Sequence, residues 1–321
     1  MKKGKLILKS FLILAFFASV ISSCRKDKTD EIDVDETSEQ TINASDERTM
    51  SSEMDDSEDE ANRLMLHHRH FRGLSWIGTL TGNHYPCNAV VDSSLKAQGR
   101  LVITFAGNTC DNKRSRSGSI TLQLPYDSVT NTVTPWSSAG CVLTLTFNNF
   151  KVTRLSNNKS IVINGVKYIS NVNGGLVDDA TTFVTPILHR ITGTMQVTFD
   201  DGTVRSWSID RSRSINRTNG ITTVTISGNA TENGISNVSI WGVNRKGNNF
   251  TVSIPTPIVA SSSCNFEPSS GVRVHNGVVR DLTVTFGVDQ SGNAVTSGCA
   301  YGYRLNWINK KGNAKQAVVS Y

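Results

Sequence analysis

Carboxylates are scarce over most of this 321-residue chain. Of its 27 Asp and Glu residues, 15 fall between residues 25 and 60, which leaves 12 for the rest. Glycosidases need two carboxylates that face each other across a cleft, and the adjacent acids Asp178-Asp179 and Asp200-Asp201 cannot do so. Asp200-Asp201-Gly202 is instead typical of a hairpin turn. The sequence therefore favours a non-enzymatic protein with no catalytic residue to name.

Other signatures of chemistry are missing as well. The chain has no Gly-x-Ser-x-Gly elbow, no phosphate loop and no His-Glu-x-x-His motif. No cysteine spacing is typical of zinc. The cluster His67, His68 and His70 alternates with arginine, so we interpret it as a basic linker end rather than a metal site. We expect neither a metal nor another cofactor.

The N-terminus lacks an apolar run long enough to cross a bilayer. Lysines precede the apolar stretch at residues 11–21, and two serines then precede Cys24. This layout resembles the lipobox of bacterial lipoproteins. The resemblance implies that residues 1–23 are a signal peptide and that Cys24 carries the acyl chains of a membrane anchor. The charged block after Cys24 resembles surface-export signals of Bacteroidota lipoproteins, which implies the outer membrane, facing outward rather than toward the periplasm.

Two regions of opposite charge follow the signal. Residues 24–63 carry almost no bulky apolar side chains, which predicts a disordered acidic tether. Residues 64–321 are strongly basic, although the net charge of the whole chain is only +6. A basic body attracts polyanions, and we expect anionic glycans or lipid headgroups as partners, and not nucleic acid. The alternative is that this charge serves solubility alone.

The body alternates apolar and polar residues throughout, which predicts antiparallel β-strands. Turn signals at Asn164-Gly165, Asp201-Gly202, Asn219-Gly220, Asn276-Gly277 and Ser291-Gly292 favour hairpins and a meander. So many strands predict an all-β fold, either a rolled sheet or a β-sandwich. Two similar lobes, 64–175 and 186–321, are a further expectation, meeting near residues 173–189.

The sequence Arg-Ser-Arg-Ser occurs twice. On strands, Arg114 and Arg116 would point to one face, and Arg211 and Arg213 likewise, with serines on the other. Two such ladders side by side would form a guanidinium shelf for phosphate, sulfate or uronate. The alternative is an exposed face balanced by acidic neighbours.

Two cysteine passages are alike. Each opens with Cys-Asn, includes a strand ending in Thr-Phe, reaches a second cysteine and enters another strand. This weak repeat predicts disulfides Cys87–Cys110 and Cys264–Cys299, each contributing about 3–4 kcal/mol, although spacing alone leaves the connectivity open. Cys141 is then left over, and its place in a strand predicts a buried residue.

Most of the body resembles a group of Bacteroidota lipoproteins, through the cysteine passages and strands such as "GTMQVTFDDGTVRSW". The resemblance implies an envelope location but no activity. Our leading hypothesis is a lipid-anchored binding or scaffolding module. The alternatives are a polysaccharide-directed hydrolase and an envelope lipid carrier. The oligomeric state stays open.

Overall fold

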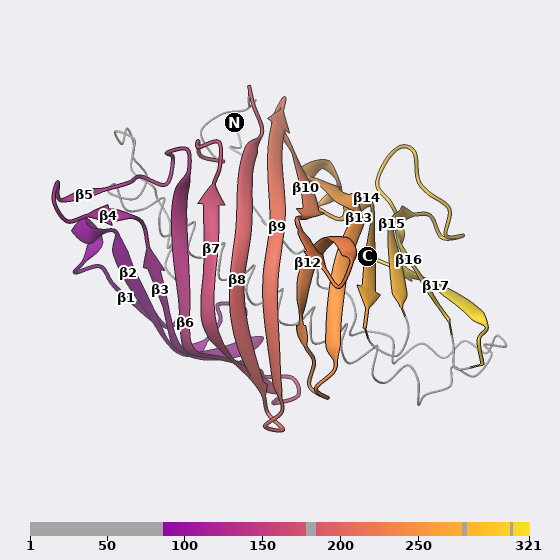
Figure 1. Ribbon diagram of the computed structural model, residues 1–321, viewed down its shortest axis with the longest axis horizontal. Coiled ribbons are helices and arrows are strands. Elements are labelled where there is room, and N and C mark those ends of the chain that lie inside the picture. The colour runs from indigo at the N-terminus through magenta and orange to yellow at the C-terminus, as the bar shows by residue number, and fades with distance from the viewer. Residues whose placement is uncertain (1–85, 178–183, 278–280, 309–310) are drawn as a thin grey trace, which may run out of the picture.

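A computed structural model describes residues 86–177, 184–277, 281–308 and 311–321. Fifteen strands form one antiparallel sheet, and β4 and β5 form a separate two-stranded one (Figure 1). The helices of the described residues are two short 3₁₀ turns, and none of them could span a membrane. The predicted all-β antiparallel meander is therefore confirmed.

The elements follow one another in chain order. They are β1 (Ala89–Asp92), η1 (Lys96–Gln98), β2 (Arg100–Asn108), β3 (Arg114–Gln123), β4 (Tyr126–Asp127), β5 (Thr132–Val133), β6 (Cys141–Arg154), β7 (Ser160–Asn171), β8 (Ile187–Phe199), β9 (Val204–Thr218), β10 (Ile221–Gly228), β11 (Ala230–Glu232), β12 (Ile235–Val243), β13 (Asn249–Ser261), η2 (Ser262–Cys264), β14 (Pro268–Asn276), β15 (Leu282–Val288), β16 (Gly302–Ile308) and β17 (Ala314–Ser320).

Strand order in the sheet largely repeats strand order in the chain. Neighbours run β1-β2-β3-β6-β7-β8-β9-β10-β13-β14-β15-β16-β17. The sheet continues across residues 173–189, because β7 and β8 pair along their length from Ile161↔Phe199 to Asn171↔His189. The strands on both sides of these residues thus belong to one sheet. In Figure 1 the central strands stand upright and those at the margins lean, as expected of a twisted sheet.

One predicted turn lies inside a strand. Asn164-Gly165 belongs to β7, whereas Asp201-Gly202 and Asn219-Gly220 do make hairpin turns with positive φ at their glycines. A Cβ on Gly165 would lie 2.4 Å from the Thr194 carbonyl oxygen. This glycine therefore allows β8 to approach closely, which is the other reason for glycine in a strand.

β10 and β12 share one strand position. Both pair with β9 on one side and with β13 on the other, and the chain leaves the sheet between them. The hairpin β11–β12, which turns at Asn233-Gly234, makes up this excursion. Gly228 is at its base, where a Cβ would lie 2.1 Å from the Asn237 carbonyl oxygen. The excursion places Asn229 beside β9.

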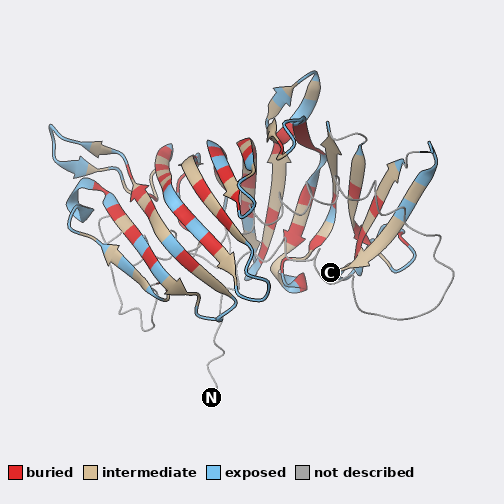
Figure 2. Cartoon of the chain, turned by 90° about the horizontal axis from the view of Figure 1, so that it is seen from below, coloured by how far each residue is buried: buried red, intermediate tan, exposed pale blue. Residues whose placement is uncertain are grey.

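The two faces of the sheet differ in burial. We call the face that carries the buried residues Leu143, Ile169 and Ile191 the inward face, and the opposite one the outward face. Figure 2 shows buried residues alternating along the strands with partly or fully exposed ones. This period of two is the one expected of an antiparallel sheet with one packed face.

Both predicted disulfides are present. Cys87–Cys110 and Cys264–Cys299 each join the two open ends of a strand pair, β1–β2 and β14–β15. After the first cysteine of each pair comes an asparagine in the left-handed region, Asn88 at φ 52° and Asn265 at φ 55°. The repeat read from the sequence is therefore a repeated structural unit.

Candidate functional site

The two Arg-Ser-Arg-Ser segments lie in β3 and β9. Arg116, Arg211 and Arg213 are inward and only 7%, 8% and 5% exposed, and Arg114 is half-buried. The serines between them are less buried and lie on the outward face. The alternation of β-strands therefore turns these arginines into the molecule rather than toward solvent.

The two segments are not side by side. Strands β6, β7 and β8 lie between β3 and β9, so four strand spacings, about 19 Å, separate them. The Arg116 guanidinium instead packs 4.6 Å from the centroid of the Phe105 ring. The guanidinium of Arg205, which is also inward on β9, packs 4.1 Å from the centroid of the Phe250 ring. The single guanidinium shelf expected from the repeated sequence is not formed.

Instead, basic side chains from β7, β8 and β9 gather on the inward face. We call Lys167, His189, Arg211 and Arg213 the inward basic band. His189 and Arg213 are direct cross-strand partners, and Arg211 is two residues from Arg213 on β9. The cross-strand partner of Lys167 on β8 is Gly193. Because glycine has no side chain, none from β8 stands between Lys167 and β9 at this position. All four are buried, Lys167 to 1% exposure.

The strands around this band supply little negative charge. In β6, β7, β8 and β9 the one carboxylate is Asp210, which lies on the outward face. A cation enclosed to this degree requires anionic or hydrogen-bonding partners. Within β6, β7, β8 and β9, no carboxylate therefore lies on the face that carries the band.

His189 is the least satisfied member of the band. It is 3% exposed and packs against the Trp136 ring at 5.3 Å between centroids. Within the part of the chain that the structure describes, neither ring nitrogen has a hydrogen-bond partner. Burial, together with the charge of Arg213, lowers the pKa of His189 to about 3. The ring is therefore neutral near pH 7 and offers one donor and one acceptor.

Asn171 extends this row to β7. It pairs with His189 across the strands and donates to the carbonyl oxygens of Trp136 and Gly175 at 2.8 and 3.0 Å. Its own Oδ1 is buried and accepts no hydrogen bond from the described residues. Buried polar atoms without a partner are rare in folded proteins, which singles out this position on the inward face.

Cys141 ends the same row on β6, opposite Asn171. It is buried, as predicted, and its Sγ lies 3.5 Å from the Thr134 carbonyl oxygen. Burial raises the pKa of its thiol to about 11. A thiol held in its protonated form is a poor nucleophile, so this cysteine packs rather than reacts.

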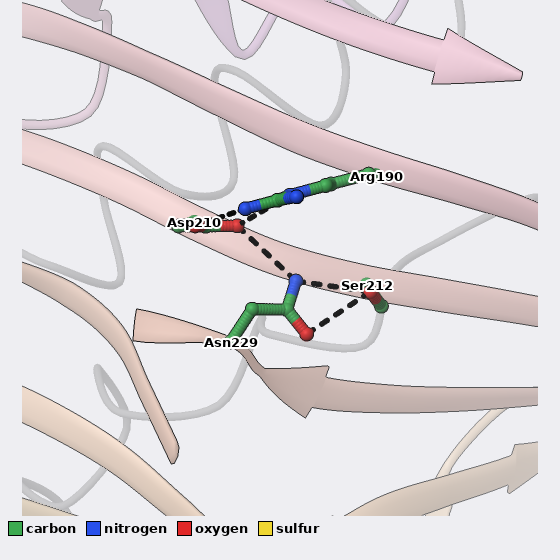
Figure 3. A network of polar contacts seen from close by, with 4 residues as sticks. All are labelled: Arg190, Asp210, Ser212 and Asn229. Atoms are coloured by element: carbon green, nitrogen blue, oxygen red, sulfur yellow. Dashed lines mark hydrogen bonds and ion pairs between the residues drawn. The ribbon is translucent and has the colours of Figure 1, made fainter. Parts of the chain in front are cut away.

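The outward face of β8 and β9 carries a different arrangement. We call Arg190, Asp210, Ser212 and Asn229 the outward network (Figure 3). Arg190 Nε and Nη2 donate to the two Asp210 carboxylate oxygens at 3.1 and 2.9 Å. The Asn229 amide nitrogen donates to Asp210 Oδ1 at 3.1 Å and to Ser212 Oγ at 2.9 Å. Figure 3 shows these four side chains converging from β8, β9 and the start of the excursion.

This network holds its two charges ionised. Burial acts to raise the pKa of Asp210, but the bonds from Arg190 and Asn229 and the charge of Arg190 outweigh it, so the pKa lies below its ordinary value. The bond to Asp210 raises the pKa of Arg190. The network is thus a fixed set of donors and acceptors with no net charge.

Several predicted residues lie outside the described residues, namely Cys24, the acidic tether, the cluster His67, His68 and His70, and the acids Asp178-Asp179. Elsewhere, Asp201 accepts from the backbone N–H of Thr203, as expected of a turn. Among described residues no three His, Cys, Asp or Glu side chains are placed to hold a metal ion.

Sequence reasoning missed Lys167, His189 and Asn171. The available signal was a polar residue at a position that the period of two assigns to the packed face, as in "SIVINGVKYISN". Comparison with known proteins adds no further guide: no family model, curated protein or solved structure matches this chain.

Proposed function

We propose that this protein is a lipid-anchored, non-enzymatic binding module of the cell envelope, and that its inward basic band receives an anionic group of a glycan or a lipid. The observation that carries the proposal is the gathering of Lys167, His189, Arg211 and Arg213 on three neighbouring strands that offer no carboxylate on that face. The cysteine-closed hairpins and the Cys24 lipobox support a place outside the cytoplasm.

The chemistry of the band fits a phosphate, sulfate or carboxylate. Two guanidinium groups supply paired donors, Lys167 supplies a point charge, and a neutral His189 supplies one more hydrogen bond. An anion held among these groups is largely removed from water, which strengthens each contact. Each charge-assisted hydrogen bond contributes about 1.5–3 kcal/mol.

The first test is retention of the full chain on immobilised heparin, with the salt concentration at elution as the readout. We expect the double variant Arg211→Gln/Arg213→Gln to elute at clearly lower salt than the wild type. The matched control Arg100→Gln/Lys159→Gln removes two exposed charges, and we expect it to elute near the wild type. Elution of both double variants at the same salt concentration would show that the inward basic band does not bind heparin, and would overturn this part of the proposal.

A second arm separates the two sources of the anion. The full chain is sedimented with vesicles of phosphatidylcholine, with and without phosphatidylglycerol. Because the proposed acyl anchor would bind both kinds of vesicle, the readout is the additional binding caused by phosphatidylglycerol. Heparin retention without this additional binding favours a glycan, and the reverse favours a lipid. Arg211→Lys/Arg213→Lys keeps the charge and loses the planar fork, so intermediate behaviour is expected of it. This variant also decides the outcome if the glutamine variant fails to fold.

A second candidate function is lipid carriage. Apolar residues lie among and beside the band on the inward face. Leu143 and Ile191 are in the same cross-strand row as Arg211, and Ile209 is in the row of Lys167. This arrangement suits a ligand with an acyl chain and an anionic head. Extraction of a fluorescent phospholipid from donor vesicles by the full chain, and its delivery to acceptor vesicles, would favour carriage over static binding.

A further inference from the structure

The outward face of β7, β8 and β9 carries one exposed aromatic side chain. Tyr168 is 43% exposed, and its direct cross-strand neighbours are the small residues Thr144 and Thr192. No bulky cross-strand neighbour therefore covers the ring. An exposed ring with a polar hydroxyl tip is a common contact for ligands that have one apolar side and several polar groups.

This ring is next to the outward network. Arg190 is two residues before Thr192 on β8, which makes it a diagonal neighbour of Tyr168, at about 7–8 Å between Cα atoms. Arg190 is in turn fixed by Asp210, and Asp210 by Asn229 (Figure 3). The ring and the network are therefore neighbours on one face, and the polar groups of the network are oriented by their bonds to one another.

The charge of this patch sets the kind of ligand. On the outward face of β7, β8 and β9 the charged side chains are Arg190 and Asp210, which form an ion pair at 2.9 Å. The remaining outward side chains include many Ser, Thr, Asn and Gln residues. A face with balanced charge and many hydroxyl groups gives no electrostatic advantage to a polyanion and complements a neutral, polyhydroxylated ligand.

We propose that Tyr168 and the outward network form a binding site for a neutral polysaccharide. The apolar face of one pyranose ring packs on the Tyr168 ring. Its hydroxyl groups exchange hydrogen bonds with Arg190, Asp210 and Asn229, which are already oriented. This site is on the opposite face from the inward basic band, takes a different class of ligand, and does not depend on the function proposed above.

The test is affinity electrophoresis of the full chain in native gels that contain mixed-linkage β-glucan, galactomannan or starch, with polygalacturonate as the anionic comparison. We expect at least one neutral polysaccharide to slow the wild type. Tyr168→Ala should weaken that retardation at least tenfold in apparent Kd, and Tyr168→Phe should retain most of it. Asp210→Asn should weaken it as well, because Arg190 then loses its bidentate partner.

The matched control is Tyr301→Ala, which removes a tyrosine of similar exposure, 41%, from outside this face. The polysaccharide should slow this variant as much as it slows the wild type, each compared with its own mobility in a gel without polysaccharide. The proposal is overturned if no neutral polysaccharide slows the chain, or if the Tyr168 and Tyr301 variants behave alike. Retardation by polygalacturonate alone, lost in the Arg211/Arg213 variant, would also overturn it, while supporting the inward band.

Discussion

Adjacent residues of β8 and β9 are in opposite surroundings. His189 points into the inward basic band and Arg190 into the outward network, and on β9 Arg211 and Asp210 divide in the same way. Outward, a carboxylate from the neighbouring strand pairs with the cation. Inward, the same strands add cations without a carboxylate. One strand pair thus builds a charge-balanced surface on one face and a charged interior on the other, which suits each face to a different ligand.

The largest expected effect concerns packing: a truncated side chain should cost far more stability on the inward face than on the outward face. Trp207 is inward and 1% exposed, and it lies in a row between Met195 and Gly242. Trp207→Ala should lower the free energy of unfolding by about 3–5 kcal/mol, because the cavity left by an indole cannot close. Ser206→Ala, one residue away on the outward face, should change it by less than about 0.5 kcal/mol. Denaturant unfolding of the full chain with intact disulfides measures both. Equal losses would mean that the outward face is packed too.

A smaller loss of free energy of unfolding should follow from adding a side chain at Gly193, the cross-strand partner of Lys167. A Cβ on Gly193 would lie 2.4 Å from the Val166 carbonyl oxygen and 2.9 Å from the Lys167 Cα. Both contacts are with backbone, so β7 and β8 have to separate. Gly193→Ala should therefore cost about 2–3 kcal/mol in the same unfolding experiment. Thr192→Ala on the outward face is the control, and a loss as small as that of the control would show that the strands yield easily.

The third prediction concerns pH. The folded-state pKa of His189, about 3, is below its ordinary value near 6.5, so the unfolded chain binds a proton first as the pH falls. The free energy of unfolding should decrease by about 2 kcal/mol between pH 7 and pH 5. Carboxylates with lowered pKa values, such as Asp201 and Asp289, lose their contribution only at lower pH.

His189→Gln supplies the comparison for this window. The variant removes the titrating group, so its free energy of unfolding should change much less between pH 7 and pH 5. Urea unfolding at pH 5, 6 and 7 compares it with the wild type. A wild-type slope that persists unchanged in the variant would assign the pH dependence to other groups.

Local rules made much of this fold predictable. The period of two identified most strands and their faces, and the Asn-Gly and Asp-Gly pairs identified two of the central hairpins. The disulfides Cys87–Cys110 and Cys264–Cys299 were predicted from a sequence repeat. In the structure, each copy of this repeat is a strand pair closed by its disulfide. Each of these signals lies within a few residues of the feature it predicts, or repeats within the chain.

What could not be predicted depends on register between distant strands. The sequence suggested that the two Arg-Ser-Arg-Ser segments meet, but strand order places three strands between them. The pairing of His189 with Arg213, or of Arg190 with Asp210, depends on how many residues lie between β8 and β9. Asn229 reaches Asp210 because the chain leaves the sheet after β10. The Asn233-Gly234 pair is a local signal for the hairpin, but it does not indicate that Asn229 meets Asp210.

The smallest predicted effect tests whether the outward charges are coupled in the way that distinguishes the two faces. Arg190 is 55% exposed, so solvent weakens its attraction to Asp210 despite the paired geometry. A double-mutant cycle with Arg190→Gln and Asp210→Asn should give a coupling free energy of about 0.5–1 kcal/mol at low salt, decreasing at 1 M salt as screening increases. A value near zero would mean that Asn229 and Ser212 hold Asp210 in place without Arg190. A larger coupling free energy that salt does not reduce would mean that the Arg190–Asp210 pair is as shielded from solvent as the inward basic band. The two faces would then differ in charge balance rather than in access to solvent.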